Sequence, residues 1–294
     1  MPDAEIEAIR KALEAHPRPA GLKERRKRLD DLSVQYPLPA DVRVEAADAN
    51  GVAAEWTGTP EADPGNVIMY LHGGGYTAGS LKSHRHMVAQ AGREARTRTI
   101  ALDYRLAPEH YFPAAVEDAV AGYRFLLSRG FLANHIAVAG DSAGGGLTVA
   151  LLVSLRDAGL PLPACAWCIS PWVDLEGAGA SMTAKAAIDP MVQQPYLVEL
   201  AAAYLSGANP RTPLAAPLYA DLRGLPPMLI QVGSAETLLD DAVRLAGAAG
   251  AADVRVRLEV WPDMIHVWQL FYQQVAAGRR ALAEAGAFIR SNWG

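Results

Sequence analysis

A short stretch, GDSAG at residues 140–144, sets a serine among glycines at the end of an apolar run. The run IAVA comes directly before it and a long helical pattern follows, so the stretch is predicted to be a sharp turn between a strand and a helix. Gly140 and Gly144 permit a turn too tight for side chains. At such a turn the hydroxyl of Ser142 is exposed and becomes a nucleophile once a base takes its proton. A phosphate-binding turn would need G-x-G-x-x-G or a P-loop lysine, and neither is present.

The base should be a histidine, and the chain has seven. Where a serine occupies a strand-to-helix turn of this kind, the order along the chain is serine, acid, histidine. Only His266 follows Ser142. It lies in WPDMIHVWQLF, between the last predicted strand and the last predicted helix. We therefore expect His266 to be the base.

A carboxylate must orient that histidine and stabilise its protonated form. The chain between the serine and the histidine offers these candidates: Asp174, Glu176, Asp189, Glu199, Asp221, Glu236, Asp240, Asp241, Asp253, Glu259 and Asp263. Glu236 lies in the loop after the apolar run PPMLIQV. Asp240 and Asp241 come a turn later, where a helix begins and negative charge is favoured. Glu236 is the candidate that fits best at this point, while Asp174 and Glu176 follow another strand and stay open.

Acyl transfer also needs donors for the developing oxyanion, each contributing about 3–4 kcal/mol. HGGGY, residues 72–76, follows the apolar run VIMYL and leaves glycine N–H groups bare. One donor is expected from Ala143, the residue after the nucleophile. Among the glycines we favour Gly74 and Gly75, with Gly73 as the alternative. The histidine before them is expected to hydrogen-bond this loop into shape.

The elements that must position these groups alternate between strands and helices. DVRVEAA and GVAAEWT read as a hairpin, and the later strands are nearly all apolar, which is typical of a mostly parallel sheet covered on both faces. Residues 177–214 carry no strand between two strands. Together with the helical residues 1–40, they could form a lid over the carboxyl ends of the strands, where ligands bind in such sheets. The basic run KERRKR, residues 23–28, is interpreted as the solvated face of a helix.

Bulk properties narrow the class of protein. The chain has 294 residues and a formal net charge of −5, so nothing draws it generally to nucleic acid or to an anionic membrane. No apolar run is long enough to span a bilayer, and the N-terminus lacks a signal-peptide pattern, which predicts a cytoplasmic protein without stable membrane anchoring. Cys165 and Cys168 fall in a predicted strand, where they point to opposite faces, so we expect structural rather than redox cysteines.

Blocks of this sequence resemble the bacterial hormone-sensitive-lipase-like esterases of the α/β-hydrolase fold. In chain order the blocks are HGGGY, DYRLAPEHYFPAAVEDA, GDSAGGGL, LPPMLIQVGSAETLLDDA and MIHVWQLF. The resemblance implies a single domain over residues 1–294, with an eight-stranded sheet and a helical cap built from about 1–40 and about 177–214. It also implies hydrolysis of short- to medium-chain carboxylic esters without a metal or organic cofactor. A homodimer formed through the last strand and helix is a further implication.

The resemblance assigns Ser142 as nucleophile, His266 as base and Glu236 as acid. Family members more often carry Asp at the acid position, in G-x-x-D-x-L, whereas this chain has G-S-A-E-T-L and so one methylene more. Within YRLAPEH and the residues after it, three charged side chains are expected to brace the site rather than to touch substrate: Arg105, Glu109 and Asp118.

The substrate pocket is expected to be walled by the cap and by a set of apolar residues: Tyr76, Trp172, Met191, Leu197, Leu205 and Val267. The same catalytic groups could instead serve a lactone, amide or formamide hydrolase or an acyltransferase, because fold and triad do not set specificity. A non-catalytic receptor for a small ligand is another alternative. The plant gibberellin receptors resemble this family but lose the histidine, which this chain keeps.

Overall fold

The centre of the molecule is an eight-stranded sheet in the order β1-β2-β4-β3-β5-β6-β7-β8. The structure is a computed structural model that describes residues 3–294, except for the side chains of residues 32 and 33. β2 is antiparallel to both its neighbours and the other pairs are parallel, so the mostly parallel sheet and its initial hairpin are as predicted. The strands are β1 (Arg43–Asp48), β2 (Ala53–Gly58), β3 (Asp63–Leu71), β4 (Thr97–Leu102), β5 (Ile136–Asp141), β6 (Cys165–Ile169), β7 (Met228–Gly233) and β8 (Val256–Trp261).

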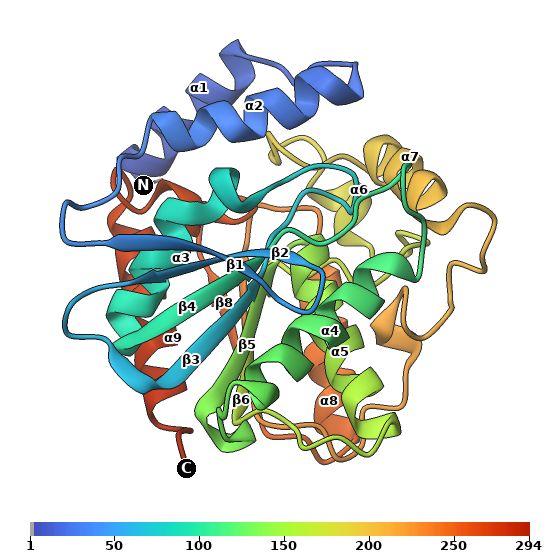
Figure 1. Cartoon of the computed structure of the whole chain (residues 1–294). Helices are drawn as coiled ribbons and strands as arrows, with labels where there is room; N and C mark the ends of the chain where they lie inside the picture. Colours follow the sequence, from blue (N-terminus) through green and yellow to red (C-terminus); the bar gives the residue numbers. More distant parts are fainter. Residues whose placement is uncertain (1–2) are drawn as a thin grey trace.

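Helices cover both faces of this sheet (Figure 1). α3 and α9 pack on one face, and α4, α5 and α8 pack on the other. The α-helices are α1 (Ala4–Ala15), α2 (Leu22–Val34), α3 (Leu81–Ala95), α4 (Ala114–Ser128), α5 (Ala143–Asp157), α6 (Ser181–Ala184), α7 (Gln194–Leu205), α8 (Leu239–Ala251) and α9 (Ala276–Arg290). Short 3₁₀ turns are η1 (Ala133–His135), η2 (Pro217–Tyr219) and η3 (Trp268–Phe271).

Burial on both faces explains the apolar strands. Every residue of β5, β6 and β7 is buried, so neither face of these strands can carry solvated side chains. Cys165 and Cys168 of β6 lie in different core clusters, on opposite faces of the sheet, as the strand pattern predicts. Both are free and buried, and burial raises the pKa of each thiol to about 12, which makes them unreactive.

The last helix is shorter than the sequence indicates. The pattern from Val267 onward predicts one continuous closing helix, but the chain first forms η3 and turns again before α9 begins at Ala276. Val267 has a positive φ of 49°, which interrupts regular helix at the point where the chain leaves the loop of His266. The extra turns keep that loop at the carboxyl end of β8.

The cap, by which we mean residues 3–40 and 177–214, lies above the carboxyl ends of the strands (Figure 1). Its two parts are joined by ion-pair and ring contacts. Arg25 of α2 pairs with Glu199 of α7 at 2.7 Å, and the guanidinium carbon of Arg18 lies 3.5 Å from the centre of the Tyr196 ring. Segments far apart in the sequence therefore meet over the same edge of the sheet.

The sheet has two edge strands, β1 and β8, and Leu258 and Val260 of β8 are exposed. The homodimer contact through β8 and the last helix stays a prediction. No helix within residues 3–294 combines the length and the apolar character needed to cross a bilayer.

Candidate active site

Ser142 lies at the turn between β5 and α5, with φ at 54° and ψ at −121°. A positive φ is costly for a residue with a Cβ, by about 1–3 kcal/mol, and persists only where the surroundings impose it. The neighbouring glycines make the turn feasible. A Cβ on Gly140 would collide with the carbonyl oxygen of Gly144, and one on Gly144 would collide with that of Leu71. Both glycines are therefore required by close backbone packing, and Ser142 is held at the apex of the turn, where it is half-buried and lines a cavity.

His266 and Glu236 form a buried pair at the carboxyl ends of β8 and β7. The Nδ1 atom of His266 lies 2.7 Å from Oε2 of Glu236, and their side chains are 6% and 0% exposed. Burial disfavours the charged imidazolium, but the hydrogen bond and the charge of Glu236 outweigh it, so the pKa of His266 is raised above its ordinary value. His266 lines the same cavity as Ser142. The arrangement suits a base whose second nitrogen serves the serine.

Glu236 is fixed through its other oxygen. Oε1 accepts hydrogen bonds from the N–H of Gly233 at 2.5 Å and from the hydroxyl of Ser170 at 2.8 Å. The same hydroxyl oxygen accepts the N–H of Val267 at 3.2 Å, which links the carboxylate to the loop of His266. Oε2 is thus left for the imidazole, in a direction set by the two hydrogen bonds to Oε1.

The other carboxylates are occupied elsewhere. Asp174 pairs with Arg244 at 2.5 Å, and Glu176 pairs with Arg211 at 2.7 Å. Asp240 and Asp241 lie in the first turn of α8, as predicted. Their oxygens also hold another segment: Oδ2 of Asp240 accepts the N–H of Ser181, and Oδ2 of Asp241 accepts those of Val173 and Asp174, each at 2.9 Å. Glu236 is the candidate that reaches His266.

The glycine loop after β3 faces the nucleophile. Gly74 and Gly75 have positive φ angles of 120° and 64° and line the cavity together with Ser142. Within the described residues their N–H groups have no acceptor, whereas the N–H of Gly73 donates to Oδ1 of Asp141 at 3.0 Å. Ala143 is the first residue of α5, so its backbone N–H has no acceptor inside the helix. Among the described residues, the N–H groups of Gly74 and Gly75 in the cavity wall and that of Ala143 next to Ser142 thus have no acceptor, whereas the N–H of Gly73 is engaged by Asp141.

Asp141 links this loop to the nucleophile's turn, a role the sequence pattern did not reveal. Its Oδ1 also accepts the hydroxyl of Tyr70 at 2.8 Å, and its Oδ2 lies 3.2 Å from Nε2 of His84. Burial alone would raise the pKa of this carboxyl, but the charge and hydrogen bonds of His84 and Tyr70 lower it below its ordinary value. Its position inside GDSAG, directly before the serine, was the available signal.

His72 shapes the loop, as expected. Its Nδ1 lies 2.8 Å from the carbonyl oxygen of Gly73, and its ring stacks on Tyr104 with centroids 4.3 Å apart. Burial lowers the pKa of His72 to about 4, so the ring is neutral near pH 7. His72 is not among the residues that line the cavity of Ser142 within the described chain.

The cavity beside Ser142 has a volume of about 160 Å³. Four of the residues expected in its walls are there: Trp172, Met191, Leu197 and Val267. Tyr76 and Leu205 are not among its lining residues. Tyr76 stacks on Tyr204 with centroids 3.8 Å apart, and Leu205 is buried in the same core cluster, so both side chains pack into the core. The walls also include apolar residues not foreseen: Leu13, Val192, Leu200 and Leu270.

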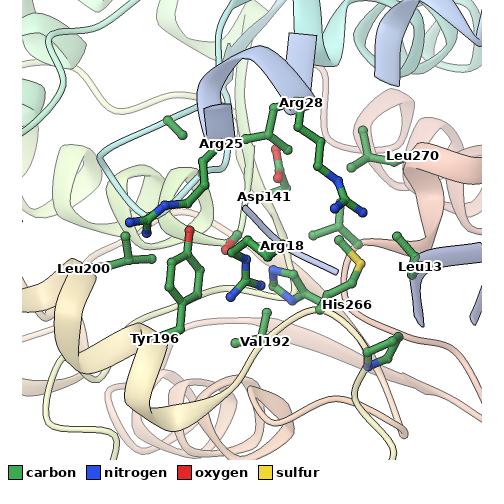
Figure 2. Close-up of a pocket in the computed structure, with 18 of the residues that line it drawn as sticks. Leu13, Arg18, Arg25, Arg28, Asp141, Val192, Tyr196, Leu200, His266 and Leu270 are labelled. Carbon is green, nitrogen blue, oxygen red and sulfur yellow. The ribbon is translucent and has the colours of Figure 1, made fainter. Parts of the chain in front are cut away.

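The interpretation of KERRKR as a solvated helix face is wrong for its arginines. Arg25 and Arg28 line the cavity, and Figure 2 shows both in the pocket that Arg18 and His266 also line, with Arg25 on the side of Tyr196. Arg26 instead donates to Glu109 at 2.7 Å and to the carbonyl oxygen of Thr77 at 2.7 Å. KERRKR was predicted to be solvated because the sequence of one helix does not show which other segments pack against it.

The predicted bracing residues lie outside the cavity. Arg105 pairs with Asp118 at 2.8 Å, and the backbone N–H of Arg105 also donates to that carboxylate at 2.7 Å. Glu109 holds Arg26 of the cap. Across the described residues, no group of three or more His, Cys, Asp or Glu side chains is arranged to hold a metal ion.

The chain order of these groups decides the class of protein. Serine, carboxylate and histidine follow one another along the sequence, and each lies after a parallel strand at the carboxyl edge of the sheet. That order distinguishes the α/β-hydrolase fold from the chymotrypsin and subtilisin types, in which the same three residue types occur in other orders.

Comparison with known proteins narrows the class. A family model described as "alpha/beta hydrolase fold" matches residues 68–270. An acetyl-hydrolase of Streptomyces hygroscopicus is 45% identical over 100% of this chain and 99% of its own. Among solved structures, an esterase of the bacterial hormone-sensitive lipase family superposes with a TM-score of 0.97 at 47% identity over 100% of both chains. The esterase EstE5, in crystals soaked with p-nitrophenyl butyrate, gives 0.95 at 45% identity over 99% of both.

The chain belongs to the bacterial hormone-sensitive lipase family of the α/β-hydrolase fold, and it is an esterase of that family.

Proposed function

We propose that the chain hydrolyses short- to medium-chain carboxylic esters through an acyl-enzyme formed on Ser142. The observation that carries the proposal is the 2.7 Å contact between His266 and Glu236 at the wall of the cavity that also exposes Ser142. His266 takes the proton of the serine hydroxyl as its oxygen attacks the ester carbonyl. The same proton then passes to the leaving alcohol. In the second half, His266 takes a proton from water as its oxygen attacks the acyl carbonyl; the bond to the oxygen of Ser142 then breaks, His266 returns the proton to that oxygen, and the acid is released.

The oxyanion that forms in each half is proposed to bind the N–H groups of Gly74, Gly75 and Ala143. Support comes from their freedom from other acceptors within residues 3–294 and from the place of Gly74 and Gly75 in the cavity wall. The cap is proposed to close this cavity from above, since its residues Leu13 and Leu197 lie in the same wall.

The acyl chain length that we propose rests on the cavity beside Ser142 and on the names of similar esterases. The cavity is about 160 Å³ and is bounded chiefly by apolar side chains, which suits a small acyl group. One relative is named an acetyl-hydrolase, and EstE5 crystals were soaked with p-nitrophenyl butyrate. We propose that acetyl and butyryl esters are turned over better than long-chain esters.

A series of p-nitrophenyl esters tests the proposal. The acetate and butyrate should be hydrolysed efficiently, and kcat/KM should fall toward the octanoate and longer esters. Ser142→Ala should lower kcat by at least about 10⁴-fold, because the nucleophile is lost while the fold is kept. Equal turnover by Ser142→Ala would refute the acyl-enzyme. Assays of ε-caprolactone and an arylformamide under the same conditions compare the lactone and amide alternatives.

A further inference from the structure

The cavity beside Ser142 carries an excess of positive charge. Its lining includes the guanidinium groups of Arg18, Arg25 and Arg28, all from the cap, and a single carboxylate, Asp141. The chain as a whole has a formal net charge of −5, so the cavity differs in sign from the rest of the molecule. A concentration of one sign of charge in a cavity attracts ligands of the opposite sign.

Arg25 has its own counter-ion. It donates to Glu199 of α7 at 2.7 Å and to the carbonyl oxygen of Ala20 at 2.8 Å. These contacts join α2 to α7 across the top of the cavity. Arg25 therefore serves to hold the cap, and its charge is already balanced.

Arg18 and Arg28 have no such partner. Arg18 lies over the ring of Tyr196, with 3.5 Å from its guanidinium carbon to the ring centre, and Arg28 donates to the carbonyl oxygen of Pro17 at 2.6 Å. Within the part of the chain that the structure describes, neither arginine forms an ion pair. An aromatic ring and a carbonyl oxygen orient these side chains without neutralising them.

The nearby carboxylates are not available to them. Both oxygens of Asp141 are taken, by Tyr70 and Gly73 on one side and by His84 on the other. Asp189 of the cap is buried, and its oxygens accept backbone N–H groups from three residues: Met191, Val192 and Thr237. Glu236 is bound to His266. Within the described residues the two guanidinium groups thus keep uncompensated charge at the cavity wall, although one N–H of Arg28 is already taken by the carbonyl oxygen of Pro17; Figure 2 shows both groups in the cavity that His266 also lines.

We propose that Arg18 and Arg28 form a subsite for a carboxylate on the substrate, so that the preferred esters carry a negative charge. Guanidinium groups present planar pairs of donors that match a carboxylate, and such charge-assisted bonds are stronger than neutral ones. This inference rests on the proposed ester hydrolysis and specifies its substrate class. The negative group can lie on the acyl or on the alcohol side of the ester, and the two are separated by experiment.

Two matched pairs of esters test the subsite on the intact protein. On the alcohol side, 4-acetoxybenzoate is compared with the neutral 4-acetoxybenzamide. On the acyl side, monomethyl adipate is compared with methyl hexanoate. The measured quantity is the ratio of kcat/KM for the charged ester to that for its neutral partner, at about pH 7.5. Because both esters are measured on one enzyme sample, loss of folded enzyme in a variant cancels from the ratio.

We expect a ratio of about 10 or more in one of the two pairs. Arg18→Gln and Arg28→Gln should each lower that ratio several-fold, and the double variant should bring it to about 1 or below, because each substitution removes a charge-assisted contact to the carboxylate. Arg28→Lys should keep part of the ratio because it keeps the charge. Lys23→Gln, an exposed cation of the same helix, is the matched control and should leave the ratio unchanged.

Salt gives a second measurement that needs no variant. Raising the ionic strength from about 0.05 to 0.5 M should lower the ratio in the wild-type enzyme, because the attraction is screened. A wild-type ratio of about 1 or less in both pairs would overturn the subsite, as would a ratio that survives in the double variant. In either case hydrolysis of the neutral esters, and its loss in Ser142→Ala, would leave the proposed function standing. If the neutral esters also fail, the proposed function itself is wrong.

Discussion

At the scale of single residues, three carboxylates within six positions of the chain have different surroundings. Glu236 contacts His266, whereas Asp240 and Asp241 accept backbone N–H groups of residues 173–181. With the length of a glutamate, one oxygen of Glu236 reaches Gly233 and Ser170 while the other reaches the imidazole. The longer side chain is thus fitted to this loop and is not a defect of the site.

Glu236→Gln should reduce kcat by about 10³–10⁴-fold, with little change in KM. The amide can donate to Nδ1 of His266, which favours the wrong tautomer and removes the charge that stabilises the imidazolium. Glu236→Asp should lose about 10–100-fold, since a carboxylate remains but lies too far from the ring. The measurement is kcat for p-nitrophenyl butyrate, with circular dichroism to show that each variant folds. Full activity of Glu236→Gln would mean that another carboxylate orients His266.

A functional residue could be predicted from the sequence when the pattern that marks it lies within a few neighbouring positions. Ser142 and Glu236 stand beside strand ends that the apolar pattern marks, so their placement followed from short segments. Asp141 was passed over because its partners, Tyr70 and His84, are about 60–70 positions away in the chain. Tyr76 was assigned to the pocket because it follows the glycine loop, but its ring packs against Tyr204 of the cap, a contact no local pattern shows.

At the scale of elements, α8 connects the acid loop to the start of the cap insertion. Its Asp241 is fully buried and accepts the N–H groups of Val173 and Asp174, the two residues that follow the turn after β6. Burial raises the pKa of Asp241 to about 7, and the two hydrogen bonds only partly oppose this effect. The role predicted for Asp241, negative charge at a helix start, is therefore incomplete, because the carboxyl is also a structural link between two segments.

Asp241→Asn should show a stability penalty that depends on pH. The folded pKa lies above the unfolded value of about 4, so the wild-type protein gains stability from a protonated Asp241 at low pH and loses it as pH rises through about 7. Asn has no charge to bury at any pH. Its penalty in the free energy of unfolding should therefore be largest near pH 4.5 and shrink toward pH 8, as measured by urea denaturation. A penalty that grows with pH would contradict this assignment.

Strands and helices could be predicted where burial gives a regular spacing of apolar residues along the chain. The apolar strands from β3 to β7 and the helices α4, α5 and α8 follow directly from their patterns. α3 was not assigned, because its sequence, LKSHRHMVAQAGREA, mixes charged residues and histidines with the apolar positions. In the structure His84 and His86 of α3 are buried, with one near Asp141 and the other near the carbonyl oxygen of Leu270. The histidines that obscure the apolar pattern of α3 are thus buried and lie within hydrogen-bonding distance of partners inside the fold.

At the scale of the whole molecule, side chains of the cap hydrogen-bond to loops that follow the strands of the sheet. One of them is Arg26 of α2, which donates to the carbonyl oxygens of Thr77 and Ala107 and to both oxygens of Glu109. Thr77 follows the glycine loop directly, so this side chain joins the N-terminal helices to the segment that carries the proposed oxyanion donors. The sequence shows a basic run here, but it could not show that Arg26 within this run hydrogen-bonds to the segment after the glycine loop.

Arg26→Gln should therefore weaken substrate binding more than chemistry. Loss of its three contacts frees α2 from the loop, so the cavity wall is less well formed; we expect KM to rise several-fold, kcat to fall less, and Tm to drop by a few degrees. Lys27→Gln is the matched control. Lys27 pairs with Asp31 on the solvent side at 2.5 Å with both side chains more than half exposed, and such a pair contributes about 0–1 kcal/mol. If the two variants behave alike in KM and Tm, the attachment of α2 does not govern the cavity. If Arg26→Gln alone changes KM, the N-terminal helices act on catalysis through their contact with the glycine loop.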